Sequence, residues 1–410
     1  MPRDFRLVRR FRALVRADPT GVRAGFVALL ISSGGDLLAG LTLGSITGTL
    51  EALPGLLVLV PAAIGMRGNI FGALGSRLGT SIHSGTFRLS RRRDTIVGQN
   101  LAASMALSIS ISLALAFLAK AIAVGFGLEN TISVADFVVI SVIGGVLSSI
   151  VVLGITLGVA GLSVRRGWDL DNVSAPIVTA VGDMVTLPAL FLATFLVQVP
   201  LVTPVIAVLC AVAGVVALVL ALRSRLVLLQ RIVRESVPIL LLAGIIDIVA
   251  GLTIEKRFQS FLVYPALLVL VPPFLEDSGA LGGILSARVA TKLHLGTLEP
   301  SRRPLRAVGD DVLLIYVYAV PVFLLLGISA DIAAAVVGLK SPGVLDMIAL
   351  SMIAGLVATT FAVFIGYYGA VVSYRLGLDP DTHGIPAVTS TLDLLGALAL
   401  ILVIVALGLT

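Results

Sequence analysis

Long apolar stretches alternate with short basic segments along the whole chain. Eleven of these stretches are long enough to cross a bilayer core of about 30 Å as helices that rise about 1.5 Å per residue. We therefore predict an all-α polytopic membrane protein with about eleven spans. The predicted spans lie near residues 24–46, 54–80, 97–126, 133–163, 172–197, 200–222, 237–254, 261–287, 311–338, 344–373 and 385–409.

The composition agrees with this class of protein. Hydrophobic residues make up 58% of the chain and charged residues 13%, and the mean hydropathy is +1.10. A soluble domain contains about 25% charged residues, so we expect almost no soluble mass. The single cysteine, Cys210, excludes an intramolecular disulfide and a multi-cysteine metal site. The basic residues follow the predicted membrane topology, so we expect a lipid bilayer and no nucleic acid as the partner.

One pattern of apolar and polar positions occurs twice. The segment from GGDLLAGLT to LGTSIHSG in the first half matches the segment from IIDIVAGLT to VATKLHLG in the second half. This match aligns Asp36 with Asp247. Further along, GWDLDNVSAPIVTAVGDMV matches GLDPDTHGIPAVTSTLDLL, which aligns Asp183 with Asp393. Internal repeats with a site at their interface are a common plan of membrane transporters.

The sixth predicted span, residues 200–222, has no counterpart in the repeat. Five spans reverse the side of the membrane, so one extra crossing makes two parallel five-helix repeats, related by an axis along the membrane normal. The segments on the N-terminal side are rich in arginine, whereas the other side holds only Lys120, Lys256, Arg257 and Lys340. This bias predicts a cytoplasmic N-terminus and an outer C-terminus in the plasma membrane, and it excludes a ten-span topology.

These features divide the chain into four parts. Residues 1–23 form a basic cytoplasmic N-terminus, 24–197 the first repeat, 198–235 the linker helix with a cytoplasmic segment, and 236–410 the second repeat. Within residues 2–20, apolar residues at near-helical spacing predict an amphipathic helix on the inner leaflet. A disordered basic tail is the open alternative.

Carboxylates inside apolar helices are the main candidates for function, because an acid in hydrocarbon is costly unless it meets a cation or another partner. Asp183 and Asp393 each lie about a dozen residues into a predicted span, near the middle of the bilayer. The repeat places them opposite each other, and a divalent cation between them would remove their repulsion. Oxygen ligands suit Mg²⁺, which keeps several waters. The alternative is that each Asp is neutral or caps a broken helix.

Threonines on the same two spans extend this candidate site. Thr179 and Thr389 occupy matching positions close to the two aspartates, where their hydroxyl groups can bind the waters of a hydrated ion. Thr186 and Thr391 are also nearby. We therefore include threonine hydroxyls in the predicted ion site.

Asp36 and Asp247 form a second matched pair, also near mid-depth in their spans. Two interpretations are open. The pair belongs to the same ion pathway, or each carboxyl group bonds to a neighbouring helix for structural reasons. Both interpretations place the acids towards the interior of the bundle.

The repeats differ at one informative point. Where the first copy reads GMR at residues 65–67, the second reads EDS at residues 276–278. Glu276 and Asp277 either form an additional ion site or pair with Arg67 across the interface. We favour the ion site, because two acids exceed what one arginine needs.

These motifs resemble the MgtE-type magnesium transporters, most closely the fused two-repeat form of the solute carrier 41 group, over nearly the whole chain. PAAIGMRGNIFGALGSRLGT is similar to the family's second-helix segment with its glycine–asparagine motif, here Gly68 and Asn69. Ala280 replaces the asparagine in the second copy, so any polar role of Asn69 belongs to one repeat. DLDNVSAPIVTAVGD and DPDTHGIPAVTSTLD resemble the fifth-helix segment, whose final Asp is the family's pore Mg²⁺ ligand. The resemblance implies this role for Asp183 and Asp393.

The leading hypothesis is therefore transport of Mg²⁺ through a pore on the pseudo-twofold axis, with Mg²⁺ as the transported ion and no organic cofactor. The closest alternative is a secondary exchanger that couples Mg²⁺ to Na⁺ or H⁺. An intramembrane aspartyl enzyme is the remote alternative, but Asp183 in AVGDM and Asp393 in STLDL do not match a GxGD context. The chain has no P-loop, HExxH or GxSxG motif, so we predict that it is not an enzyme. Because one chain holds both repeats, we expect it to supply a complete pore, with a dimer as an open alternative.

Overall fold

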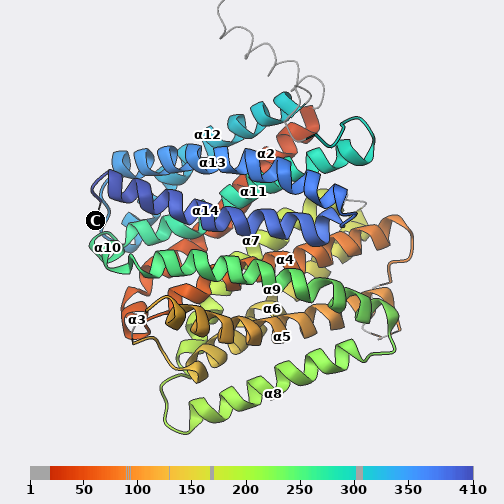
Figure 1. Ribbon diagram of the computed structural model, residues 1–410, viewed down its shortest axis with the longest axis horizontal. Coiled ribbons are helices and arrows are strands. Elements are labelled where there is room, and N and C mark those ends of the chain that lie inside the picture. The colour runs from red at the N-terminus through yellow and green to blue at the C-terminus, as the bar shows by residue number, and fades with distance from the viewer. Residues whose placement is uncertain are drawn as a thin grey trace, which may run out of the picture.

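The fold is an all-α bundle, seen in a computed structural model that describes residues 19–88, 90, 92, 94–128, 130–166, 170–301 and 308–409. Within these residues, eleven helices are long and apolar enough to cross a membrane, which confirms the predicted number of spans. The helices run roughly along one direction (Figure 1). They are α2 (Pro19–Ser45), α4 (Leu56–His83), α5 (Ile96–Gly125), α6 (Val134–Arg166), α7 (Leu170–Thr194), α8 (Val202–Leu222), α9 (Val227–Glu255), α11 (Ala266–His294), α12 (Gly309–Val337), α13 (Val344–Arg375) and α14 (Ile385–Ala406).

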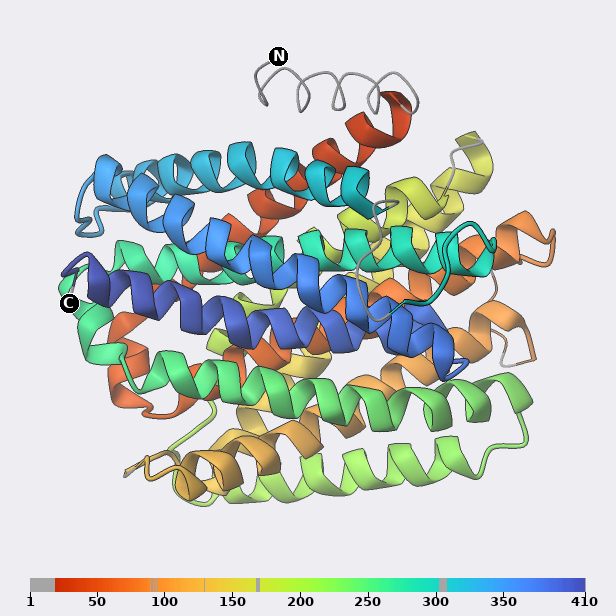
Figure 2. The same cartoon turned by 45° about the horizontal axis from the view of Figure 1, so that its top comes forward.

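The two repeats share one helix order. α2, α4, α5, α6 and α7 match α9, α11, α12, α13 and α14, and α8 stands alone between them. α8 lies at the edge of the bundle, against α5 and α6 (Figure 1, Figure 2). Its residues Val208, Leu209 and Leu220 are exposed, as expected for a helix face that meets lipid. The predicted amphipathic segment of residues 2–20 lies almost entirely outside the described residues.

Two short helices are absent from the predicted elements. α3 (Thr47–Ala52) follows α2, and α10 (Phe258–Val263) follows α9 at the matching place in the second repeat. Both lie at the end of the bundle that also holds the C-terminus, on the left in Figure 1. We call this the α3/α10 end. The opposite end, where α4 finishes at His83 and the loops carry Arg92 and Arg223, is called the basic end.

The seventh span is longer than predicted. α9 begins at Val227 instead of near residue 237, so the segment 223–236, which lies between two predicted spans, is largely helical. Arg231 pairs with Glu235 one turn later, with 2.8 Å between Nε and Oε1. Such pairs support a helix that continues beyond the hydrocarbon. Hydropathy ends a span at the first charged residues and therefore misses this extension.

The first helix of each repeat packs onto the other repeat. α2 contacts α11 as well as α7, and α9 contacts α4 as well as α14. Figure 2 shows α2 crossing the bundle obliquely on its way to α3. Matched glycines permit these crossings: a Cβ on Gly40 would lie 2.0 Å from the Val269 carbonyl oxygen, and a Cβ on Gly251 would lie 2.6 Å from the Val58 carbonyl oxygen. Small residues let membrane helices approach closely, so the two repeats interlock.

A carboxylate of the second repeat also holds the start of α4. Glu255, the last residue of α9, accepts hydrogen bonds from the backbone N–H groups of Gly55 at 2.8 Å and Leu57 at 3.2 Å. The first N–H groups of a helix have no partner inside the helix, and they favour negative charge. This contact fixes where α4 begins, and α4 forms one wall of the site described next.

Candidate cation-binding site

A cavity of about 610 Å³ lies between α4, α7, α11 and α14. It extends along α4 from Gly65, in the middle of the bundle, to the exposed Thr80 near the basic end. Two carboxylates, Glu276 and Asp393, lie at its deep end. The lining residues are Gly65, Gly68, Asn69, Gly72, Ala73, Ser76, Thr80, Thr179, Glu276, Ala280, Ile385, Pro386, Thr389 and Asp393.

Equivalent positions of the two repeats line this cavity. Thr179 of α7 matches Thr389 of α14, and both are on the lining. Asn69 of α4 is on the lining together with its counterpart on α11, Ala280. The cavity therefore lies at the boundary of the two repeats. It brings together three polar residues of the sequence prediction, Asn69, Thr179 and Thr389.

Four aspartates gather around the deep end in two pairs. The carboxyl groups of Asp36 and Asp183 interact within the first repeat, and those of Asp247 and Asp393 interact within the second. The charge of Glu276 acts on all four. The sequence places Asp183 opposite Asp393, whereas in the structure the carboxyl group of each interacts with an aspartate of its own repeat.

These aspartates are buried and lack hydrogen-bond donors. Asp36 and Asp183 are 0% exposed, Asp247 is 1% exposed and Asp393 is 7% exposed. Among the described residues, the carboxylate oxygens of Asp36, Asp183 and Asp247 accept no hydrogen bond of good geometry, although the Ser390 hydroxyl is close enough to act on Asp247. Buried polar groups in proteins are nearly always satisfied, and charged ones are paired or bound to metal ions. The cluster therefore has the chemistry of a site that receives a cation.

Glycine at position 65 makes room for the second pair. A Cβ on Gly65 would lie 2.8 Å from Oδ2 of Asp247 and 3.9 Å from Oδ2 of Asp393. On the other side, a Cβ on Gly279 would lie 3.7 Å from Oδ1 of Asp393. Because neither glycine has a side chain, the backbones of α4 and α11 can pack directly against these carboxylates. In the first repeat, Gly35 lets α2 approach α7, because a Cβ there would lie 2.6 Å from the Ala180 carbonyl oxygen.

Asp277 is buried on the first-repeat side of the cluster. The Ser33 hydroxyl donates a hydrogen bond of 2.7 Å to Oδ1 of Asp277, and Oδ2 has no partner among the described residues. Asp277 also acts electrostatically on Asp36. Sequence reasoning missed Ser33, although it lies three residues before Asp36, the spacing that puts two side chains on one helix face. Asp36, Asp183, Asp247 and Asp277 are all absent from the cavity lining.

Arg67 does not pair with these acids. Its Nε donates to Ser148 Oγ at 2.6 Å, and its Nη1 donates to the Ala63 carbonyl oxygen at 2.6 Å. The guanidinium group therefore points towards α6, and in the part of the chain that the structure describes no ion pair joins it to Glu276 or Asp277. The alternative in which the two acids neutralise Arg67 is not what the structure shows.

Two of the predicted threonines bond to their own helices. Thr186 donates to the Gly182 carbonyl oxygen at 2.6 Å, and Thr391 donates to the Ala387 carbonyl oxygen at 2.7 Å. Neither lines the cavity. Thr389 also donates to its own helix, at 3.2 Å to the Pro386 carbonyl oxygen, but it is on the lining. A hydroxyl oxygen keeps its acceptor capacity in such a bond.

The carboxylates do not converge on one dry coordination site. Within residues 19–409, apart from the gaps noted above, no group of three or more His, Cys, Asp or Glu side chains is placed to hold a metal ion. Mg²⁺ usually keeps several waters and takes one or two carboxylates. The paired acids beside a cavity therefore fit a hydrated ion better than one coordinated only by protein.

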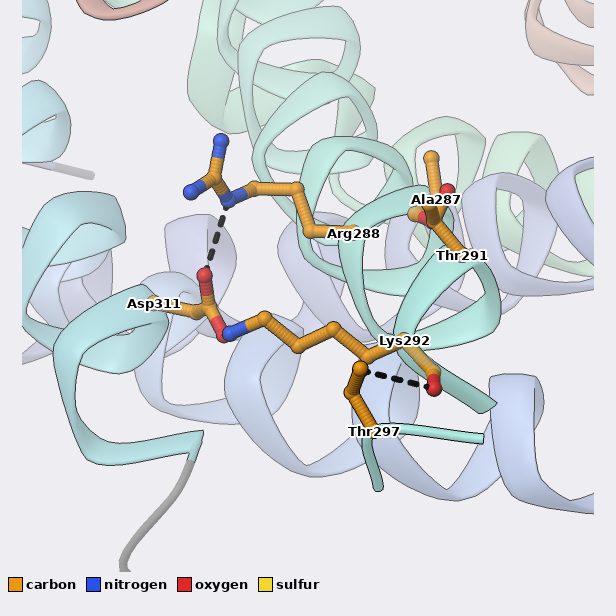
Figure 3. Close-up of polar contacts among 6 residues, drawn as sticks. All are labelled: Ala287, Arg288, Thr291, Lys292, Thr297 and Asp311. Carbon is orange, nitrogen blue, oxygen red and sulfur yellow. Dashed lines mark hydrogen bonds and ion pairs between the residues drawn. The ribbon is translucent and has the colours of Figure 1, made fainter. Parts of the chain in front are cut away.

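The basic ends of α4 and α11 differ between the repeats. Arg288 of α11 forms an ion pair with the buried Asp311 of α12 at 2.9 Å, and Lys292 pairs with the other oxygen of the same carboxylate (Figure 3). In the first repeat the matching arginine, Arg77, donates to Asn100 Oδ1 at 2.7 Å. The arginine of the second repeat is thus bound to a carboxylate, whereas the matching arginine of the first repeat is bound to the neutral side chain of Asn100.

Comparison with known proteins agrees with the two repeats. The family model MgtE, described as a divalent cation transporter, matches residues 60–193 and 271–403, one stretch in each repeat. Solute carrier family 41 member 3 of Rattus norvegicus is 25% identical over 405 residues, which cover 90% of this chain and 84% of the relative. Solute carrier family 41 member 2 of Xenopus laevis is 24% identical over 404 residues, which cover 90% of this chain and 69% of the relative.

No solved structure matches the chain significantly. The family match spans most of both repeats and includes α4, α7, α11 and α14, the four helices that line the cavity. It confirms the resemblance inferred from the repeated motifs. The chain belongs to the MgtE family of divalent cation transporters.

Proposed function

We propose that the protein carries Mg²⁺ across the membrane between its two repeats, and that the ion binds as a hydrated cation at the deep end of the cavity. One observation carries this proposal: Glu276 and Asp393 line the deep end of the cavity, and buried aspartates without hydrogen-bond partners among the described residues lie directly behind them. Like charges in a low-dielectric interior repel strongly, and a divalent cation offsets that repulsion.

The size of the cavity supports an ion that keeps its water. Six waters around Mg²⁺ occupy about 180 Å³, at about 30 Å³ each. The cavity of about 610 Å³ has ample room for such a complex. Hydroxyl and amide groups of Thr179, Thr389 and Asn69 on the lining would then bind the waters of the ion.

The acids would have different roles. Glu276 and Asp393 line the cavity, so we assign them the direct contact with the ion or its waters. Asp247 is beside Asp393 and raises the negative potential at the same place. Asp36, Asp183 and Asp277 lie behind the lining and add charge at longer range. The family role of the fifth-helix aspartate then belongs more directly to Asp393 than to Asp183.

We infer that the basic end faces the cytoplasm. Arg88, Arg92, Arg223 and Arg225 are in loops at this end, and cytoplasmic loops of membrane proteins are enriched in arginine and lysine. The cavity would then be accessible from the cytoplasm, and the C-terminus would lie outside in the plasma membrane. Both repeats contribute to the cavity, so one chain would form a complete pathway.

A coupled exchanger is the second candidate. Asp36, Asp183 and Asp277 form an acidic group that does not line the cavity, so a Na⁺ ion or proton bound there would be separated from Mg²⁺. The exchanger predicts that Mg²⁺ flux responds to an imposed Na⁺ or H⁺ gradient. Simple conduction predicts a response to the Mg²⁺ gradient and the membrane potential alone.

The test is Mg²⁺ flux into liposomes that contain the purified chain and a Mg²⁺-sensitive dye. We expect flux from the wild-type protein and a severe loss in Glu276→Gln. The matched control is Glu51→Gln, which removes an exposed acid of α3 far from the cavity lining. Wild-type protein that is folded but gives no divalent cation flux under any gradient would contradict the proposal.

A further inference from the structure

A second, much smaller cavity lies beyond the carboxylates, on the side away from the large cavity. Its volume is about 20 Å³, and it also touches Glu276 and Asp393. A cavity needs about 10–15 Å³ to hold one water, so this one is too small for a hydrated ion. The carboxylates therefore separate a wide cavity on one side from a narrow space on the other.

The small cavity is walled by apolar residues in matched pairs. Six residues of α4 and α11 line it: Val60, Pro61, Ile64, Val271, Pro272 and Leu275. Val60 matches Val271, Pro61 matches Pro272, and Ile64 matches Leu275 in the repeat. All six are buried. Equivalent residues of the two repeats thus meet on the α3/α10 side of the acids, because α4 and α11 both begin at that end.

An apolar constriction of this kind stops ions. Water leaves a narrow hydrophobic passage, and an ion would have to give up its hydration shell to enter it. Mg²⁺ dehydrates reluctantly, so the penalty is especially large for this ion. In the described conformation, an ion at the carboxylates has a path to the basic end and none through these six residues.

Each wall of the constriction contains a proline at which its helix can bend. Pro61 of α4 and Pro272 of α11 have no N–H group, so the carbonyl oxygens of Leu57 and Leu268 lose their usual partners inside the helix. Proline is one of the few recognised causes of a sharp helix bend. Both bends would lie within the constriction itself, at equivalent positions. Movement of the first turns of α4 and α11 can therefore open the passage while the rest of each helix stays in place.

We propose that Val60, Pro61, Ile64, Val271, Pro272 and Leu275 form an apolar gate between the carboxylates and the α3/α10 end, closed in the described conformation. The inference rests on the proposed function, because it concerns how ions reach the same carboxylates. The gate makes the site accessible from the basic end alone, and an ion passes through the protein only after α4 and α11 separate at these six residues.

The first test measures accessibility and needs no transport. In a Cys210→Ser background, Ala73→Cys places a thiol on the wall of the large cavity. A charged, membrane-impermeant thiol reagent is applied without Mg²⁺ to each face of oriented proteoliposomes. We expect labelling from the face at the basic end. Labelling from the other face should rise on the order of tenfold when Ile64→Ala and Leu275→Ala widen the gate.

Two further variants control for damage to the fold. Leu59→Ala with Leu270→Ala removes the same volume from matched buried positions of the same helices that do not line the small cavity. This control should leave labelling one-sided. Ile64→Val with Leu275→Val is a milder widening, and it should give an intermediate rate if the alanine variant does not fold.

Flux separates failure of the gate from failure of the proposed function. If the widened variants show two-sided labelling but no variant carries Mg²⁺, the gate stands and Mg²⁺ transport is wrong. If the wild type carries Mg²⁺ but labels equally from both faces, or if widening leaves labelling one-sided, the gate is wrong. Faster Mg²⁺ leak through the widened variants, and not through the Leu59/Leu270 control, would support both.

Discussion

The two repeats enclose different groups at one equivalent place. In the first repeat, α4, α5 and α6 surround Arg67, and a Cβ on Gly145 of α6 would lie 2.7 Å from its Nη2 and 2.4 Å from Ser112 Oγ. In the second repeat, the corresponding glycine, Gly355, meets an aromatic ring instead, with a Cβ that would lie 2.3 Å from Cγ of Phe323. The same helix crossing is thus filled by a cation and a hydroxyl in one half and by a phenyl ring in the other.

The phenyl ring of the second repeat is packed against another ring, whereas the arginine and serine of the first repeat keep polar atoms without hydrogen-bond partners. Phe323 packs against Phe274 with ring centroids 5.3 Å apart. Arg67 makes two hydrogen bonds, but its Nη2 and the neighbouring Ser112 Oγ have no partner among the described residues. The base of the first repeat therefore does not neutralise the additional acids of the second. A fused chain permits this divergence, because each position occurs once, whereas a homodimer would change both halves together.

The largest expected effect separates the two fifth-helix aspartates. Asp393→Asn removes a carboxylate that lines the cavity, and Asp183→Asn removes its counterpart behind the lining. A lost charged contact of about 3 kcal/mol corresponds to a decrease on the order of a hundredfold. We expect this loss of Mg²⁺ flux in Asp393→Asn and a smaller loss in Asp183→Asn. Wild-type flux in the double variant would remove both residues from the ion site.

The next prediction removes or replaces, one at a time, the side chains that fill this helix crossing in each repeat. Phe323→Ala should lower the free energy of unfolding by about 3–5 kcal/mol, because it leaves a cavity against Phe274. The matched control, Ser112→Ala, should be nearly neutral, because its hydroxyl has no partner to lose. Arg67→Met should raise the melting temperature, since a buried charge without a countercharge is replaced by an apolar side chain of similar length. Thermal unfolding in detergent measures all three, and equal losses at Phe323 and Ser112 would refute the comparison.

A third prediction concerns the crossings that interlock the repeats. Gly40→Ala and Gly251→Ala each force a methyl group against a backbone carbonyl, with an expected cost of about 1–3 kcal/mol. Gly40→Ala should be the more severe change, because its Cβ would be 2.0 Å from the carbonyl oxygen, against 2.6 Å at Gly251. Gly68→Ala, where a Cβ meets nothing within 4 Å, is the control. An unaltered melting temperature in Gly40→Ala would show that the helices are not held this closely.

The smallest effect is expected at the basic end. Asp311→Asn removes the carboxylate shared by Arg288 and Lys292, whose side chains are 34% and 32% exposed. Solvent screens such pairs, so the loss should be below about 1 kcal/mol. It should shrink further at high salt, whereas Asp310→Asn, at the exposed neighbouring position, should have no effect. A salt-independent loss would point to packing of the Asp311 side chain as the cause.

The sequence was sufficient to predict the eleven spans, because apolar length and arginine placement are properties of the chain itself. It also led to the acids at the centre of the candidate site. It did not predict that α2 and α9 each pack against helices of the other repeat as well as their own. A sequence repeat shows which positions are equivalent, but it does not show which positions are in contact. For the same reason, the pairing of Asp36 with Asp183 emerges only from the packed helices.

The sequence also did not predict that the two fifth-helix aspartates differ in their exposure to the cavity. Asp183 and Asp393 are equivalent in the repeat, yet only Asp393 is on the lining, where Glu276 has replaced the glycine of the first copy. Thr186 and Thr391 lie near these aspartates on the same two matched helices, and both donate their hydroxyl hydrogens to carbonyl oxygens of their own helices. Such choices depend on rotamers and neighbouring backbone, which spacing along one chain does not determine.

The packing of each repeat's first helix against the other repeat has a consequence for biogenesis. α2 leaves the ribosome early, but one of its main contacts, α11, is synthesised only after nearly the whole first repeat and the linker helix. The first repeat therefore waits in the bilayer with α2 incompletely packed, and its own α4 lacks α9 during the same interval. Final assembly follows translation of the second repeat. Half-chains made separately would each lack a structural helix, and they would reach the native arrangement only by finding one another in the membrane.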